Sequence, residues 1–287
     1  MTASLDTLVI AAYVFATTLS IRRTGPEGTV SDHELIALAV CQAIVGIPSD
    51  RQFLGIVGRL LPGFFPTLPS QSRYNRRLRR LAPYLTTVQL QVAELIASGR
   101  VRLVDGTLVG CANYAGCKHV SDFAGYAAYG YCRSKSEWVW GVRLVVLADA
   151  AGVPVGYTIA PANEREYEPA FQLASAHPGT ILFADKGFWG AEFKDTLDLI
   201  DVQLVTPDKH RLGQRPPAEV AKARIRLVIE SVFANLKRQM RLEDHLAKTI
   251  GGLVQRIAQR LLALTIGMFL NALTGRPPRA LAAYDGR

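Results

Sequence analysis

The chain has 287 residues, 49% of them hydrophobic, and a formal net charge of +9. This composition excludes a disordered chain and supplies enough apolar material for one large domain or two smaller ones, while the positive charge favours a polyanionic partner, either nucleic acid or an anionic membrane. The longest apolar run, Leu8 to Ile21, is too short to span a bilayer and lacks the flanks of a signal peptide, so we expect a soluble cytoplasmic protein with no membrane partner.

Residues 1–98 are predicted to form an all-helical domain. Apolar residues between Leu8 and Leu19 recur at helical spacing. Ser31 followed by Glu34 is typical of a capping box and predicts the start of a second helix. Ser49 opens a third helical pattern in the same way, and two prolines end it.

The segment 72–81, SRYNRRLRRL, is the most distinctive part of this half of the chain. Arg73, Arg76, Arg77 and Arg80 lie at i, i+3, i+4 and i+7, on one face of a helix. Such a face needs no ligand, because charged residues are often simply solvated. Since the whole chain is basic and the neighbouring helices are apolar, the alternative of a helix that contacts DNA phosphates is favoured. A further helix is predicted from residue 86 to residue 97.

After Gly99 the hydrophobic period changes from helical to that of strands. Three antiparallel strands and then helices alternating with strands predict a mixed five-stranded sheet with helices on both faces, an α/β fold that extends over residues 99–275. Residues 276–287 are left as a C-terminal tail. The Gly- and Tyr-rich segment 113–136 is predicted to be a loop. The five strands are predicted at 101–111, 138–148, 153–160, 180–185 and 202–206.

The four cysteines do not form a disulfide framework in a chain of this length. Cys111, Cys117, His119 and Cys132 have the residue types of a zinc site, but their spacing includes no Cys-x-x-Cys pair. Reduced thiols are therefore favoured over structural zinc.

Three acidic residues occupy comparable places in the predicted elements. Asp105 interrupts the apolar strand VRLVDGTLVGC, Asp185 ends the buried strand TILFAD, and Glu230 lies on a basic amphipathic helix. A single aspartate at a strand end often only caps the following turn. Three acids brought together from two strands and a helix form a site that suits hard divalent cations.

These motifs resemble the DDE transposases of bacterial insertion sequences. Asp105 in VDGT is similar to the first catalytic acid of that family, and Asp185 in ADKGF is similar to the second. Arg226, Glu230 and Lys237 match the spacing of the family's Tyr-x2-Arg-x3-Glu-x6-Lys pattern, whose acid is the third. On a continuous α-helix these three positions fall on one face. The resemblance covers most of residues 100–245 and implies a ribonuclease-H-like fold.

The sequence departs from the family pattern at two places. Ala223 stands where the tyrosine would be. In the segment ANERE, Arg165 and Glu166 stand where related sequences have His-Asp, so no function is carried over to Asn163 or Glu166.

The resemblance implies a metal-dependent transposase that cleaves and joins phosphodiester bonds of double-stranded DNA, acting as a homo-oligomer at element ends and target, in the bacterial nucleoid. Two Mg²⁺ or Mn²⁺ ions would be held by the acids, with Asp105 bridging both and Asp185 and Glu230 each completing one. Arg226 and Lys237 would hold phosphates.

Two other functions stay open from the sequence. A ribonuclease-H-like nuclease or resolvase would use the same acids without joining strands, and a DNA-binding protein that has lost catalysis would keep the basic surface. A metallophosphatase is disfavoured because the chain has only five histidines and no His-Asp cluster. Terminal inverted repeats beside the gene would favour the transposase.

Overall fold

A computed structural model describes residues 3–22, 28–112, 117–133, 135–185, 187, 191–206 and 217–286. The chain divides into two units: residues 1–96 with 234–287, and residues 97–233. The first boundary lies close to the predicted one at residue 98, but the second unit ends at Phe233 and not at residue 275. The C-terminal segment belongs instead with the N-terminal helices, because it contains a long helix that packs among them.

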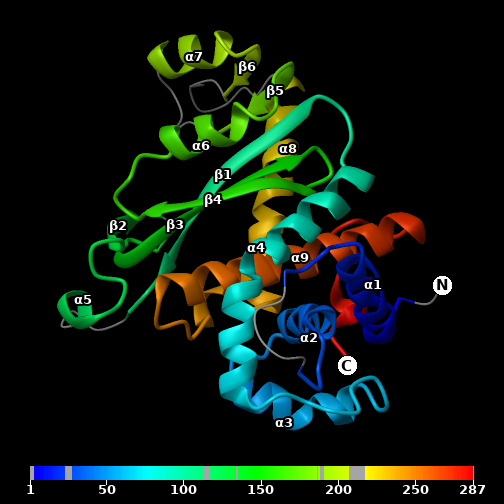
Figure 1. The fold of residues 1–287 in the computed structure, drawn as a ribbon. Coiled ribbons are helices and arrows are strands. Elements are labelled where there is room, and N and C mark those ends of the chain that lie inside the picture. Colours follow the sequence, from blue (N-terminus) through cyan, green and yellow to red (C-terminus); the bar gives the residue numbers. More distant parts are fainter. Residues whose placement is uncertain are drawn as a thin grey trace. The chain divides into compact units, whose positions relative to one another are not determined.

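That helix is α9 (Ile250–Leu273), which forms the core of the helical unit (Figure 1). It packs against α4 (Gln71–Ile96), α2 (Asp32–Ile44) and α1 (Leu5–Thr17). Its length and composition would allow it to cross a membrane, but nearly all of its most apolar stretch is buried inside the unit, as expected for a core helix. Burial of this apolar surface holds the C-terminal segment to the N-terminal helices.

The N-terminal helices follow the predicted pattern except at Pro83. The capping box of Ser31 and Glu34 is present at the start of α2, and Ser49 caps α3 (Asp50–Leu60). The two predicted helices at 72–81 and 86–97 are one continuous helix, α4, with Pro83 inside it. The buried stripe that includes Leu78 and Leu85 continues through the proline, and its packing on α9 outweighs the lost backbone hydrogen bond.

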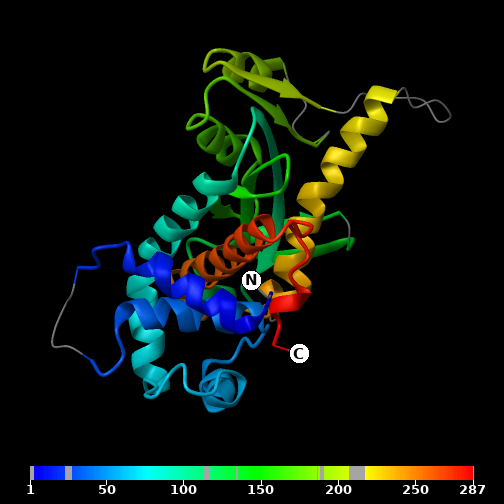
Figure 2. The same ribbon diagram turned by 90° about the vertical axis from the view of Figure 1, so that its right-hand side faces the viewer.

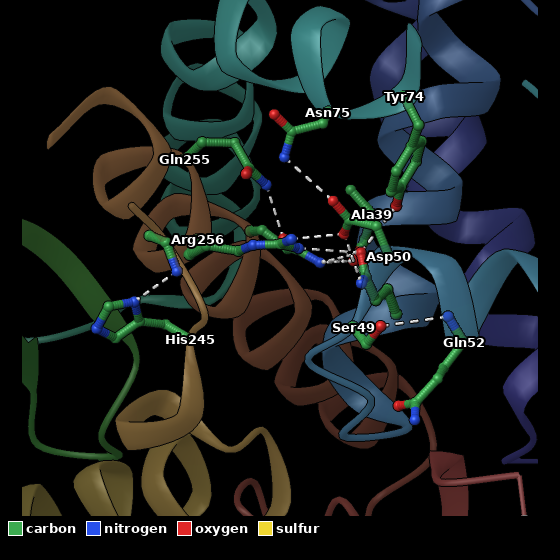
Figure 3. A network of polar contacts seen from close by, with 12 residues as sticks. Ala39, Ser49, Asp50, Gln52, Tyr74, Asn75, His245, Gln255 and Arg256 are labelled. Carbon is green, nitrogen blue, oxygen red and sulfur yellow. Dashed lines mark hydrogen bonds and ion pairs between the residues drawn. The ribbon is translucent and has the colours of Figure 1, made fainter. Parts of the chain in front are cut away.

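A buried polar network joins four helices of this unit (Figure 3). The carboxylate of Asp50, at the start of α3, accepts hydrogen bonds from Arg256 of α9 at 2.5 Å, Gln42 of α2 at 2.9 Å and Asn75 of α4 at 3.1 Å. The hydroxyl of Tyr74 donates to the side-chain oxygen of Gln42 at 3.0 Å. Asp50 and Arg256, which carry opposite charges, therefore form an ion pair inside the core.

The other unit is built on a mixed sheet in which the strands follow the order β4-β3-β1-β5-β6 (Figure 1). The first three strands are antiparallel, and β5 and β6 run parallel to β1. This confirms the predicted mixed sheet, in which three antiparallel strands are followed by two strands that alternate with helices. The five strands that correspond to the prediction are β1 (Val101–Gly110), β3 (Glu137–Asp149), β4 (Pro154–Pro161), β5 (Thr180–Phe183) and β6 (Val202–Val205).

A sixth strand, β2 (Ala128–Cys132), corrects the prediction of a loop between β1 and β3. It pairs with the first residues of β3, so that β2 and β4 occupy successive parts of the same edge of β3. A short helix, α5 (Cys117–Val120), precedes it. The Tyr and Gly residues that suggested a loop instead form an alternating strand pattern, because Tyr129 and Tyr131 share one face.

The helices of this unit lie on opposite faces of the sheet (Figure 2). Val104 of β1 packs with α6 (Tyr167–Ala174) and α7 (Ala191–Asp198) in one apolar core. The helix α8 (Pro217–Ala234) lies on the other face. The predicted polar connection before α8 lies outside the described residues, apart from its last residue.

Candidate active site

Asp105 lies in the middle of β1, on the opposite face from Val104 because neighbouring residues of a strand alternate. Its carboxylate accepts a hydrogen bond from the backbone N–H of Gly106 at 2.8 Å. Burial raises the pKa of Asp105 from 3.8 to about 7, and the charges of Glu166 and Asp185 add to this, against the Gly106 hydrogen bond and the charge of Arg226. A buried carboxylate with acidic neighbours favours a proton or another cation.

The parallel pairing of β1 with β5 explains why Asp185 lies near Asp105. Leu103 is level with Phe183 in this pairing. Each aspartate stands two residues further along its own strand direction, so the two are level with each other, Asp105 within β1 and Asp185 just beyond the end of β5. The side chain of Asp185 is about one-third exposed.

Arg226 connects Asp185 to the third acid. Its guanidinium donates from Nη1 to Asp185 Oδ1 at 2.9 Å, and its Nε lies 3.3 Å from Glu230 Oε1, one helical turn along α8. Arg226 therefore links Asp185, just beyond β5, with Glu230 on α8. The charges of Arg226 and Asp185 both act on Asp105 in β1. The aromatic residue of the ADKGF motif, Phe188, lies outside the described residues.

The donor set of this site fits a hard divalent cation. Carboxylate oxygens are the ligands that Mg²⁺ and Mn²⁺ prefer, and the Arg226 guanidinium already provides a positive charge between two of them. Within the part of the chain that the structure describes, however, no three His, Cys, Asp or Glu side chains are close enough to hold a metal ion as they stand. A metal ion would have to replace Arg226 and draw the acids together.

The raised pKa of Asp105 predicts how stability depends on pH without divalent cations. Between pH 3.8 and about 7 the folded chain holds a proton on Asp105 that the unfolded chain releases. The contribution of this group to the free energy of unfolding should therefore fall as the pH rises through this range, and level off above it. Asp105→Asn should remove that contribution.

Urea unfolding in EDTA at pH 5 and pH 8, for the wild type and Asp105→Asn, measures this effect. From pH 5 to pH 8, the free energy of unfolding should fall more, or rise less, in the wild type than in Asp105→Asn. Identical pH dependence in both proteins would contradict a raised pKa at Asp105.

Glu166 lies at this site although the sequence analysis assigned it no function. It precedes α6 and forms an ion pair with Arg143 of β3. A Cβ atom added at Gly106 would lie 3.1 Å from its Oε1, and one added at Gly187 would lie 3.9 Å from its Oε2. Glu166 therefore sits against the glycines that follow both aspartates. The glycines of VDG and DKG were the sequence signal for this close approach.

Glu166→Gln should lower the free energy of unfolding by about 1–3 kcal/mol, because Arg143 is only 15% exposed and would keep a buried charge without its carboxylate. Chemical unfolding near neutral pH measures the change. Glu243→Gln, which removes the partner of Lys237 in a more exposed ion pair, is the matched control and should cost under about 1 kcal/mol. Equal costs for the two variants would show that the Arg143 pair is an ordinary surface contact.

Lys237 does not continue the α-helix of Glu230. The α-helix ends at Ala234, and Asn235–Gln239 form a π-helix, with the N–H of Met240 bonded to the carbonyl of Asn235. Lys237 therefore lies beyond the α-helix that carries Arg226 and Glu230, and the predicted shared face stays a prediction, since a π-helix rotates each residue by a smaller angle than the α-helix assumed. The Nζ of Lys237 lies 3.2 Å from Glu243 Oε1.

The four arginines of the predicted DNA-binding face lie on α4 but in two different environments. Arg77 and Arg80 each contact Asp32 of α2 at 2.6 Å, and Arg77 also donates to the carbonyl of Val30. Arg73 and Arg76 are exposed. Arg79, which does not belong to the predicted face, is exposed as well. Two of the four therefore help to hold α4 against α2.

Two of the cysteines considered for zinc, Cys111 and Cys132, are in no disulfide within the described residues and have intermediate exposure. Burial raises the pKa of Cys111 to about 12, which disfavours the thiolate that a metal needs. The side chain of Cys117 lies outside the described residues, so the preference for reduced thiols over structural zinc stays a prediction.

Comparisons with known proteins place these observations in a family. Residues 96–266 match the model of the transposase DDE domain. A search of curated proteins found no match. Among solved structures, one described as a crystal structure of a pre-cleavage Mos1 transpososome is 13% identical over 88% of this chain and 82% of that chain, with a TM-score of 0.21.

Proposed function

We propose, since the chain belongs to the family of transposases with a DDE domain, that it cuts DNA strands and joins the freed ends to other DNA. The observation that supports this most directly is that the Arg226 guanidinium pairs with both Asp185 and Glu230 while its charge also acts on the nearby, buried Asp105. An ordinary surface ion pair would not need a largely buried aspartate in the middle of a sheet.

Each acid has its own proposed role. Asp105, the most deeply buried of the three, would hold both of two Mg²⁺ or Mn²⁺ ions, while Asp185 and Glu230 would each hold one. The ions, when bound, supply a nucleophile at neutral pH and stabilise the leaving oxyanion. Arg226, released from the two acids, would then hold a phosphate of the DNA strand. Lys237, which lies on the segment that follows α8, would hold another phosphate.

The experiment that tests this function uses the DNA that flanks the gene. The purified chain, a labelled duplex carrying that DNA and Mg²⁺ should give cleaved strands with 3′-hydroxyl ends and, in addition, products joined to a second duplex. Cleavage without any joined product would support the nuclease alternative. If neither product forms, the alternative of a DNA-binding protein without catalysis is favoured. Bacterial origin, location at the nucleoid and assembly as a homo-oligomer on DNA belong to the same proposal.

The exposed arginines of α4 are proposed to contact DNA phosphates. The double variant Arg73→Ala with Arg76→Ala should weaken DNA binding and lower the slope of log affinity against log salt by about two, because each phosphate contact contributes about one unit. A salt titration by fluorescence anisotropy measures the slope.

The matched control is Arg51→Ala with Arg59→Ala, which removes the same charge from exposed positions of α3. Its slope should stay close to that of the wild type. If both pairs lower the slope equally, α4 is only part of a generally basic surface.

A further inference from the structure

Four aromatic side chains lie on one face of the β2–β3 ribbon, residues 128–141. In the antiparallel register, Tyr131 is opposite Trp138, and Tyr129 is opposite Trp140. Residues directly opposite each other point to the same face, so the four rings form two neighbouring rows. The rings of Tyr131 and Trp138 are in contact, with centroids 5.4 Å apart.

This aromatic face is open along most of its length. Trp138 is 67% exposed, Tyr131 47% and Tyr129 40%, while Trp140 is buried at the base of the ribbon. The opposite face is covered, since a Cβ atom added at Gly130 would lie 2.5 Å from the carbonyl oxygen of Ala162. Exposed apolar surface costs free energy in water, and three neighbouring exposed rings are typical of a surface that binds a partner.

The register also relates this face to the proposed active site. Asp105 is opposite Val146, and Trp138 stands eight positions earlier on β3, which places its side chain on the same face of the sheet as Asp105. Eight residues of strand measure about 26 Å, close to the rise of about eight base pairs of DNA. A DNA molecule cut at Asp105 could therefore reach the ribbon within one helical turn.

We propose that the aromatic face of this ribbon stacks on unpaired bases of the DNA that the active site cuts, an inference that rests on the proposed function. Aromatic side chains stack on any base without reading its sequence, and a base inside a duplex is already stacked on both sides. The ribbon is therefore suited to a base that has left the duplex. The exposed side chains of Arg133 and Lys135 at its turn can hold the adjoining phosphates, although Lys135 also lies 3.9 Å from Glu137.

The test compares two fluorescent duplexes that share one sequence, one fully paired and one with a single-stranded tail. Trp138→Ala should weaken binding of the tailed duplex about tenfold, within the range measured for loss of one stacking contact, and weaken binding of the paired duplex much less. Trp138→Phe should restore most of the loss, because phenylalanine keeps a ring. Tyr13→Ala, at an exposed aromatic residue of α1, is the control and should change neither affinity.

Three outcomes separate this inference from the function on which it rests. Equal affinity of Trp138→Ala and the wild type for the tailed duplex, while the wild type still cleaves DNA with Mg²⁺, would overturn the ribbon proposal alone. Unchanged DNA affinity with weaker self-association in sedimentation would show that the ribbon contacts a second copy of the chain instead. Failure of the wild type to bind either duplex or to cleave would overturn both proposals.

Discussion

Asp105→Asn, Asp185→Asn and Glu230→Gln should each reduce the rate of DNA strand cleavage by about a thousandfold or more. Each replacement keeps the shape of the side chain and removes a negative charge that would hold a divalent ion. Metal ions supply several kcal/mol of stabilisation to such reactions, and about 1.4 kcal/mol corresponds to a factor of ten in rate. DNA affinity should change little, because each replacement keeps the side chains proposed to hold phosphates, including Arg226 and Lys237.

Single-turnover nicking of labelled duplex with Mg²⁺ or Mn²⁺ measures the rates, and anisotropy measures the affinities. Asp198→Asn is the matched control, since Asp198 is an acid of the same unit that lies on α7 and contacts Lys194 at the surface. It should cleave at the rate of the wild type. A near-normal rate for any one of the three variants would remove that acid from the site.

Asp50→Ala should destabilise the helical unit by about 3–5 kcal/mol, the largest effect on stability that we expect from a single substitution. Asp50 and Arg256 are 5% and 6% exposed, so removal of the carboxylate leaves a guanidinium buried without a counter-charge (Figure 3). Gln42 and Asn75 would also lose the acceptor of their side-chain hydrogen bonds. A loss of this size is a large part of the stability of a typical domain.

Urea unfolding measures the cost, and two further variants show its origin. Asp244→Ala removes the partner of Arg241 in an exposed ion pair and should cost under about 1 kcal/mol. The double variant Asp50→Leu with Arg256→Met removes both charges and should recover much of the loss, because no unpaired charge stays buried. If the double variant were less stable than Asp50→Ala, hydrogen bonding rather than charge pairing would hold the network together.

The parts of the structure that the sequence predicted are those set by local pattern. Five of the six strands follow from apolar runs and turn residues, and Asp105 and Asp185 were grouped because both lie in or at the end of predicted strands and match the family's motifs. Arg226 and Glu230 are one helical turn apart, so their contact followed from spacing alone. The mixed sheet with three antiparallel strands, and the ribonuclease-H-like fold that the resemblance implied, are confirmed, while the order of the strands was not predicted.

The features that the sequence did not predict depend on contacts between distant segments. Arg77 and Arg80 share a helix periodicity with Arg73 and Arg76, but only the folded chain brings Asp32 to two of them. The π-helix at 235–239 has no local sequence pattern that would separate it from the preceding α-helix. Arg260 of α9 donates to the carbonyl of Met240 and so fixes this segment to the helical unit.

The position of Glu166 at the proposed active site also depends on contacts between distant segments, which the sequence did not predict. Its position beside Gly106 depends on how β4 leads into α6 and on the ion pair with Arg143, which lies 23 residues away in sequence. Because Arg165 and Glu166 stand where related sequences have His-Asp, no function was carried over to Glu166, whereas the structure places its carboxylate beside Gly106.

The measurement that tests the central claim most directly is strand cleavage of flanking DNA by the wild-type chain as a function of divalent cation. We expect cleavage and joining with Mg²⁺ or Mn²⁺, none in EDTA, and recovery when the ion is added back. Cleavage that continues undiminished in EDTA, or a correctly folded chain that binds the DNA but never cuts it with either ion, would contradict a metal-dependent site at Asp105, Asp185 and Glu230.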